Sequence, residues 1–248
     1  MKTIRRMDLT QEMVTLVHRQ VEDGGPLPGL DHQTDDDYHA MTSRLLSSHA
    51  DGEDAWLFAY GSLIWKPECE HVEERCGTAQ GWHRSFCFRV WRFRGTRECP
   101  GLMMALDRGG QCKGVLLRLP AASLREQVDR LCRREITVKP ANTSPRWVTV
   151  VSDGIRLRAI AFVMNRTARA YVGKLSPEET AEVLVKACGH WGSGAEYLFN
   201  TVCKLEERGI HDRYLWQLQR LVAERIKPAL PNPPATSIPL NGTLQPQQ

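Results

Sequence analysis

One carboxylate interrupts an apolar stripe in the segment that follows Pro120. Apolar residues recur there at the spacing of an amphipathic helix, at Leu124, Val128, Leu131 and Cys132. Glu135 follows Leu124 by eleven positions and, at about 100° per residue, returns to within roughly 20° of the same face. Burial raises the pKa of a carboxyl group toward the range in which it both accepts and gives a proton near neutral pH. The pattern therefore indicates an acid–base residue.

The same position also has a purely structural interpretation. Glu135 can stand at the helix end, turn outward, or pair with Arg133, Arg134 or Arg146. Structural ion pairs perturb carboxylates as catalytic sites do. Helix phase alone does not separate the two interpretations.

A second candidate is Tyr60-Gly61-Ser62-Leu63, which directly follows an apolar run typical of a strand. Glycine permits a tight turn, and successive backbone N–H groups of such a turn can point at one anion. The loop suits a substrate carboxylate, although a strand that ends in Gly-Ser is more often an ordinary turn.

Arginines alternate with aromatic residues from Arg84 to Arg94, as they do in stacking platforms for single-stranded nucleic acid. A half-buried strand explains most of this, because Phe86, Phe88 and Val90 would share one face and the arginines the solvated one. The net charge of +4 is also too small to indicate a nucleic-acid partner.

Other chemistries find little support in the sequence. The eight cysteines form no Cys-x-x-Cys pair and no zinc spacing, so inert thiols in a reducing compartment and no metal are expected. Dinucleotide and phosphate-loop motifs are not found, and we expect no cofactor. Without a leader pattern or an apolar run of about 20 residues, the expected location is the cytoplasm, away from the membrane.

The elements that position these residues change along the chain. Two helices are expected before residue 55, around Leu9–Val21 and after the acidic run Asp35–Asp37. Short apolar runs separated by glycine and proline predict strands from Trp56 to Met164, and Ser152-Asp153-Gly154 predicts a hairpin turn. Capping signals at Ser176, Ser193 and Asp212 predict three later helices.

This order predicts an α+β fold with a mainly antiparallel sheet or barrel, because strands gather in the middle and helices at both ends. The expected organisation is a helical extension over residues 1–54, a catalytic domain over 55–227 and a disordered tail over 228–248. The sequence does not indicate an oligomeric state.

Several motifs in order resemble the ChaC family of glutathione-specific γ-glutamylcyclotransferases over roughly Trp56 to Val222. They are Phe58-Ala59-Tyr60-Gly61-Ser62-Leu63-Ile64-Trp65, Gly81-Trp82-His83-Arg84, Arg94-Gly95-Thr96 with Pro100-Gly101, Arg133-Arg134-Glu135, Tyr171 to Ser176, Gly189 to Leu198, and Gly209-Ile210-His211-Asp212.

The resemblance implies a small γ-glutamylcyclotransferase-like barrel that converts glutathione to 5-oxoproline and cysteinylglycine without a cofactor. It implies that Glu135 is the catalytic glutamate and that Tyr197 lines the same pocket. It also implies that the loop holds the γ-glutamyl group, with Tyr60, Gly61, Ser62 and Leu63 in contact and Ile64 and Trp65 shaping the turn.

The sequence departs from the family pattern immediately after Glu135. Relatives usually carry a glycine and a tyrosine there, whereas this chain reads Ile136-Thr137-Val138-Lys139-Pro140-Ala141. Specificity for the leaving half of the substrate is therefore open. The alternatives are a cyclotransferase for another γ-glutamyl amino acid or amine, and a ligand-binding module of the same fold that turns nothing over.

Overall fold

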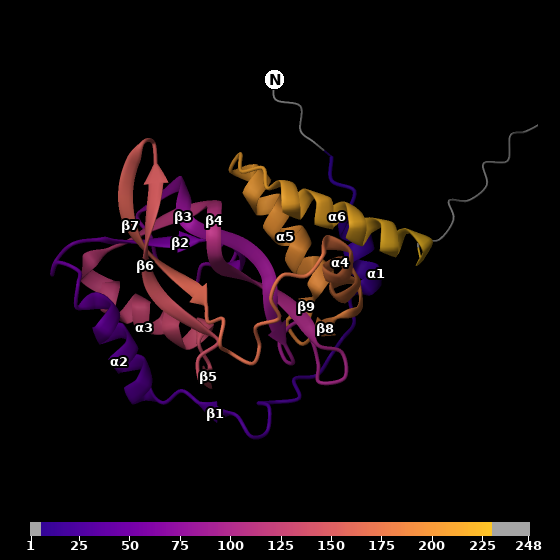
Figure 1. The fold of residues 1–248 in the computed structure, drawn as a ribbon, viewed down its shortest axis with the longest axis horizontal. Helices are drawn as coiled ribbons and strands as arrows, with labels where there is room; N and C mark the ends of the chain where they lie inside the picture. Colours follow the sequence, from indigo (N-terminus) through magenta and orange to yellow (C-terminus); the bar gives the residue numbers. More distant parts are fainter. Residues whose placement is uncertain (1–5, 230–248) are drawn as a thin grey trace, which may run out of the picture.

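A closed barrel organises residues 6–229, the part of the chain that this computed structural model describes. Its strands follow the order β2-β4-β3-β6-β7, and β7 closes the barrel by running parallel to β2 and β4. They are β2 (Ala55–Ala59), β3 (Glu73–Val90), β4 (Gly101–Leu119), β6 (Thr143–Ser152) and β7 (Ile155–Met164). This barrel with flanking helices confirms the predicted α+β class (Figure 1).

β3 and β4 form a longer antiparallel ribbon than periodicity predicts. The register shifts between Gln80 and Trp82, where Gly81 adopts a φ of +79°. A bulge of this kind interrupts the alternation of inward and outward side chains, so the sequence predicts short separate strands instead of one long ribbon. The pattern predicts three of these: Ser85–Val90, Leu102–Leu106 and Gly114–Leu119.

Apolar side chains of the barrel strands point to two sides. Phe58, Leu106 and Leu116 fill the barrel interior and are fully buried. Their strand neighbours Leu57 and Leu117 face outward into a second, larger core that is shared with the helices. This alternation is what a strand buried on both faces requires.

Helices cover the outside of the barrel in two groups (Figure 1). One group consists of α2 (Asp35–Leu46) and α3 (Leu124–Glu135), and the short 3₁₀ turn Ala121–Ser123 precedes α3. The other consists of α4 (Pro177–Lys186), α5 (Gly194–Glu207) and α6 (Arg213–Ile226). Both groups pack apolar faces on the outer core, and α3 and α5 thereby reach the same region of the barrel.

The predicted helix caps are largely present. Ser176 and Glu179 form a complete capping box at the start of α4. The helix ends at Lys186 and not at Gly189, because β8 (Cys188–Gly189) pairs with β9 (Gly192–Ser193). Ser193 caps α5, but Glu196 does not complete the expected box.

The N-terminal segment is packed onto the barrel. In α1 (Gln11–Val17), Met13 and Val14 lie in the outer core beside α5 and α6. Residues 18–33, here called the N-terminal strap, then run along one side of the molecule toward α2 (Figure 1). The strap ends in β1 (Asp31–His32), which pairs antiparallel with β5 (Val138–Lys139).

The predicted tail, residues 228–248, falls almost wholly outside the described residues, which end in the 3₁₀ turn Lys227–Ala229. Through residues 6–229, the helices are all too short or too polar to cross a bilayer.

Candidate active site

The loop after β2 is a tight turn held by its own backbone. A 3₁₀ turn, Ser62–Ile64, forms with hydrogen bonds from Ile64 N to Gly61 O (3.0 Å) and from Trp65 N to Ser62 O (3.1 Å). Leu63 and Ile64 are only 4% and 5% exposed, so their side chains anchor the loop in the outer core. The first N–H groups of such a turn have no carbonyl partner within it and can donate to a group outside it.

Tyr197 from α5 closes one side of this loop. Its side chain is buried, and its ring lies edge-on to both Trp65 and Phe86 with ring centroids 6.1 Å apart. A β-carbon at Gly61 would lie 2.9 Å from the Tyr197 hydroxyl, so glycine is required there. The backbone N–H of Ser62 bonds to the same hydroxyl.

Glu135 is the last residue of α3 and lies near the loop. Its side chain is 21% exposed, and its Oε1 lies 3.1 Å from Nε of Arg134. Arg134 Nη2 in turn donates to Ser62 Oγ at 3.3 Å, and the same guanidinium bonds to the carbonyl of Lys66. The carboxylate is therefore half-buried and tied through one arginine to the loop.

The environment disfavours a charge on Glu135. Burial raises the pKa of its carboxyl group above the ordinary value, the Arg134 guanidinium opposes the shift, and Glu68 adds to it. Its position at the negative end of a helix dipole acts in the same direction as burial. A carboxyl group with a raised pKa can exchange protons near neutral pH.

Two tyrosines respond to the Glu135 charge and so lie in its neighbourhood. Burial raises the pKa of Tyr197 to about 12, with Glu135 the second contribution. The pKa of Tyr60 rises well above its usual range for the same two reasons, and its hydroxyl donates to the carbonyl of Phe162 at 2.7 Å. Both phenols stay protonated at neutral pH and can act as hydrogen-bond donors.

Arg94 is a site residue that the sequence prediction placed wrongly on a solvated strand face. It is only 6% exposed, and its guanidinium lies 5.2 Å from the Tyr197 ring centroid and 5.7 Å from that of Trp65. It donates to Glu196 Oε2 at 2.8 Å. This bond takes the carboxylate that the capping box was predicted to use.

Arg84 was also predicted on the solvated face and is buried. It donates to the carbonyls of Tyr60 (2.6 Å) and Lys113 (2.7 Å) and pairs with Asp212. One guanidinium thus joins the loop to β4 and to the start of α6. The Gly-Trp-His-Arg and Gly-Ile-His-Asp motifs meet in this contact.

The predicted common face of Phe86, Phe88 and Val90 is also wrong. A register shift between Ser85 and Phe88 turns consecutive residues inward, so that Phe86 packs under Tyr197 while Cys87 faces a different small core. The alternation of residue types in the sequence cannot reveal such a register shift.

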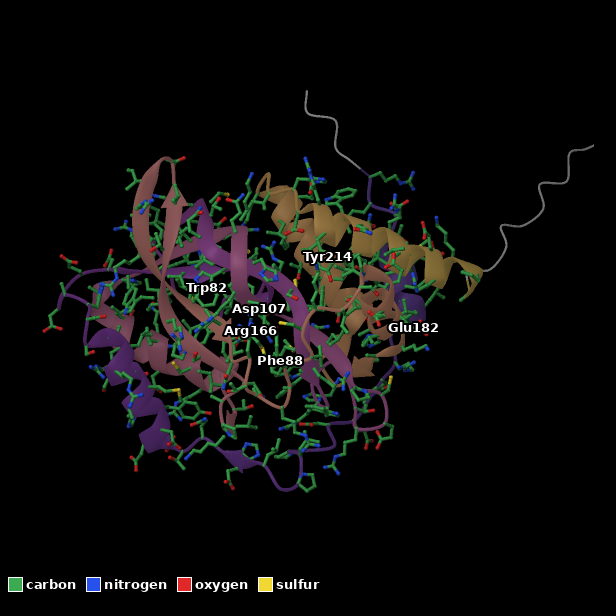
Figure 2. The ribbon with its side chains drawn as sticks, viewed as in Figure 1. Trp82, Phe88, Asp107, Arg166, Glu182 and Tyr214 are labelled. Atoms are coloured by element: carbon green, nitrogen blue, oxygen red, sulfur yellow. The ribbon has the colours of Figure 1, made fainter. Side chains whose placement is uncertain are left out.

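A second buried carboxylate, Asp107, has a structural environment. Burial would raise its pKa, but hydrogen bonds from Arg166 Nε (2.7 Å), the Arg108 backbone and Tyr171 outweigh burial and hold the pKa below its usual range. Figure 2 shows Asp107 and Arg166 close to Phe88, away from Glu182 and Tyr214 on α4 and α6. This fully paired carboxylate is unsuited to proton transfer.

The structure therefore gathers the predicted residues into one place. Tyr197 contacts Gly61 and Ser62 of the loop, Glu135 is joined to Ser62 through Arg134, and the charge of Glu135 acts on Tyr60. Trp65 is held by a bond from its indole N–H to Thr201 Oγ1 (3.2 Å). Within residues 6–229, no group of His, Cys, Asp or Glu side chains has the arrangement of a metal site.

The fold defines a class of protein. A solved structure of a yeast γ-glutamyl cyclotransferase specific to glutathione superposes with a TM-score of 0.63 at 20% identity. The match covers 70% of this chain and all of the yeast chain. The chain thus has the γ-glutamylcyclotransferase fold that the resemblance implied.

Sequence comparison narrows the class to a family. The family model described as ChaC-like protein matches residues 55–225. An Escherichia coli protein named glutathione-specific γ-glutamylcyclotransferase is 35% identical over 190 residues, covering 75% of this chain and 81% of the relative. The mouse glutathione-specific γ-glutamylcyclotransferase 1 is 31% identical, covering 60% of this chain and 68% of the relative. The chain belongs to the ChaC family.

Proposed function

We propose that this protein is a γ-glutamylcyclotransferase that cleaves glutathione to 5-oxoproline and cysteinylglycine, with Glu135 as the proton-transfer residue. The observation that carries the proposal is the half-buried Glu135 carboxylate, which Arg134 ties to Ser62 of the Tyr-Gly-Ser-Leu loop. The family and the names of the relatives support the substrate.

The reaction needs one base and no added reactant. The α-amine of the γ-glutamyl group attacks its own γ-carbonyl carbon, and the bond from that carbon to the cysteinyl nitrogen breaks. Glu135 takes a proton from the attacking amine and returns it to the leaving amine, so that atoms and charge balance. Because nucleophile and electrophile belong to one molecule, the site acts mainly by holding a folded conformer.

The loop and Tyr197 supply the groups that hold this conformer. The Leu63 backbone N–H near the start of the 3₁₀ turn and the Ser62 hydroxyl suit the α-carboxylate of the γ-glutamyl group. The Tyr197 hydroxyl stays protonated and can serve as the donor to the oxyanion that develops at the γ-carbonyl oxygen.

The test is incubation of the purified protein with glutathione and with a panel of other γ-glutamyl amino acids and amines. Formation of 5-oxoproline and cysteinylglycine supports the proposal. Cyclisation of panel compounds but not of glutathione would correct the substrate. Binding of γ-glutamyl compounds with no product from any of them would establish the binding module instead.

A methyl group at Gly61 should disturb the site through Tyr197. In Gly61→Ala the new carbon lies 2.9 Å from a hydroxyl whose ring is packed between Trp65 and Phe86, so either the loop or the ring must move. We expect kcat/KM to fall about 10- to 100-fold, since misplacement by about 1 Å has effects of this size. Steady-state kinetics of 5-oxoproline release provides the measurement.

The double variant Gly61→Ala/Tyr197→Phe checks the cause. Removing the hydroxyl makes room for the methyl group, so the double variant should lose no more activity than Tyr197→Phe alone. Strictly additive losses would show that Gly61 is required for another reason.

The pH profile should follow the environment of Glu135. The charged carboxylate is the base, so kcat/KM rises with pH as Glu135 loses its proton. Because burial raises the pKa, this rising limb of the pH profile lies above pH 4.5, the ordinary pKa of glutamate. Glu68→Gln removes a negative charge that raises this pKa and should move the limb to lower pH. Glu70→Gln, an exposed neighbour, is the control and should leave it in place.

Two further expectations belong to this proposal. We infer that residues 55–227 form the catalytic domain, since the loop, Glu135 and Tyr197 all lie within them, and that residues 1–54 are an extension. We also infer a cytoplasmic location, supported by eight cysteines that are all unpaired thiols. Fractionation of cells tests the location.

A further inference from the structure

A cavity of about 280 Å³ is lined in part by residues that are close in the sequence to Glu135 and Arg94. Three pieces of chain line it: strap residues 26–32, residues 88–93 at the end of β3, and residues 137–142 after α3, with Arg169 at one side. The third piece contains the segment that departs from the family pattern. The strap wall lies outside residues 55–225, which match the family model.

Chain continuity places this cavity next to the reacting groups. Thr137 follows Glu135 by two residues, which span at most about 7 Å. Elsewhere in the lining Phe93 precedes Arg94, whose guanidinium lies over the Tyr197 ring. A substrate with its γ-carbonyl beside Glu135 would therefore extend its leaving half toward the cavity.

The charges around the cavity have one sign. Arginine and lysine side chains line it, and no aspartate or glutamate among the described residues does. Arg92 pairs with Asp23 and Lys139 with Asp37. The remaining two cations, Arg89 and Arg169, are exposed and form no ion pair within residues 6–229, and Arg169 lies over the Trp91 ring, 5.9 Å from its centroid.

The rest of the lining is mainly apolar. Leu27 and Leu30 from the strap line the cavity together with Val90 and Pro140. Its volume is near the lower end for ligand pockets, which suits a dipeptide better than a longer chain. The combination fits a short, weakly polar group that ends in a carboxylate.

We propose that this cavity binds the leaving half of the substrate, a dipeptide with a free C-terminal carboxylate, and that Arg89 and Arg169 bind that carboxylate. The inference rests on the proposed function, because it takes the γ-glutamyl group at the loop as the starting point. Specificity for the leaving half then depends in part on strap residues, which lie outside the region that matches the family model.

The experiment compares glutathione with its C-terminal amide, which differs only in the charge of the terminal group. Wild type should show a KM about 10-fold or more lower for the acid, the size expected for a charge-assisted hydrogen bond. In Arg89→Met/Arg169→Met this preference should disappear. Arg156→Met, an exposed arginine on β7 away from the cavity, should keep it.

A second pair of variants tests the strap wall. Leu30→Asp adds a negative charge to the lining of the cavity and should raise the KM for glutathione more than the KM for the amide. Leu30→Asn has the same size without the charge and should affect both substrates equally. Thermal unfolding of each variant checks that the fold is retained.

The outcomes separate this inference from the proposed function. Equal KM values for acid and amide in wild type, or a preference that survives in the double arginine variant, would overturn the subsite and leave the reaction standing. If wild type forms no 5-oxoproline, the reaction is wrong. The subsite is then judged by calorimetric binding of cysteinylglycine, which must be weaker in the double variant for the proposal to hold.

Discussion

Glu135→Gln is expected to abolish most 5-oxoproline formation while leaving the fold intact. General acid–base catalysis contributes about 10²- to 10⁴-fold, so kcat should fall by that amount. Glutamine has nearly the same shape and can still accept from Arg134, so KM should change little. Single-turnover assays with glutathione measure the loss of the chemical step directly.

The same variant should be at least as stable as wild type at pH 7. The folded pKa of Glu135 is raised above the ordinary 4.5, so the native state binds more protons than the unfolded state between these two values. Stability then falls as pH rises through this window, and the ionised carboxylate is a cost at neutral pH. Glutamine removes that cost, and the difference in Tm should vanish near pH 4.

Two results would contradict this picture. Full activity in Glu135→Gln would show that another group transfers the proton. Loss of activity together with a large drop in Tm at pH 7 would make Glu135 a structural partner of Arg134. Glu126→Gln, at an exposed position of the same helix, is the control for helix-surface effects.

Arg84→Met is expected to produce a large loss of stability. Its guanidinium is buried and serves Asp212 and the carbonyls of Tyr60 and Lys113, and all three lose a partner in the variant. Removing one member of a buried ion pair costs about 3–5 kcal/mol. The lower end is expected because Asp212 is 22% exposed and keeps some contact with water. Urea unfolding measures the change in free energy.

The partner residue provides the control for Arg84. Asp212→Asn keeps the helix cap of α6, whose side-chain oxygen accepts from the Leu215 N–H, but removes the charge. It should cost less than Arg84→Met, because the carbonyls of Tyr60 and Lys113 keep their donor. A loss in Arg84→Met no larger than in an exposed arginine variant would show that these bonds do not hold the loop.

The sequence predicts the elements that carry their own local signals. The helix over Leu124–Glu135 follows from apolar spacing, and α4 follows from its capping box at Ser176. The hairpin between β6 and β7 follows from Ser152-Asp153-Gly154. Each of these features depends on residues that are close together in the sequence, so one sequence is enough to predict it.

Features that depend on distant partners could not be predicted. Arg84 and Arg94 look like solvated strand residues, because their acceptors, Asp212 and Glu196, lie more than 100 residues away. The pairing of β1 with β5 involves two residues on each side and leaves no periodic signal. Both arginines belong to motifs that resemble the ChaC family, next to glycine and aromatic residues. Their membership in these motifs was the signal that could have predicted a buried role.

Three glycines near Arg94 allow close backbone packing next to the candidate active site. Gly95, Gly101 and Gly189 bring three segments into backbone contact, leaving no room for a β-carbon at any of them. Backbone that is packed in this way loses little conformational entropy when a ligand binds nearby, because folding has already ordered it. A γ-glutamyl peptide has many rotatable bonds and must lose most of its own freedom on cyclising. This backbone cluster therefore adds little to the entropic cost of binding, whereas the ordering of the ligand adds much.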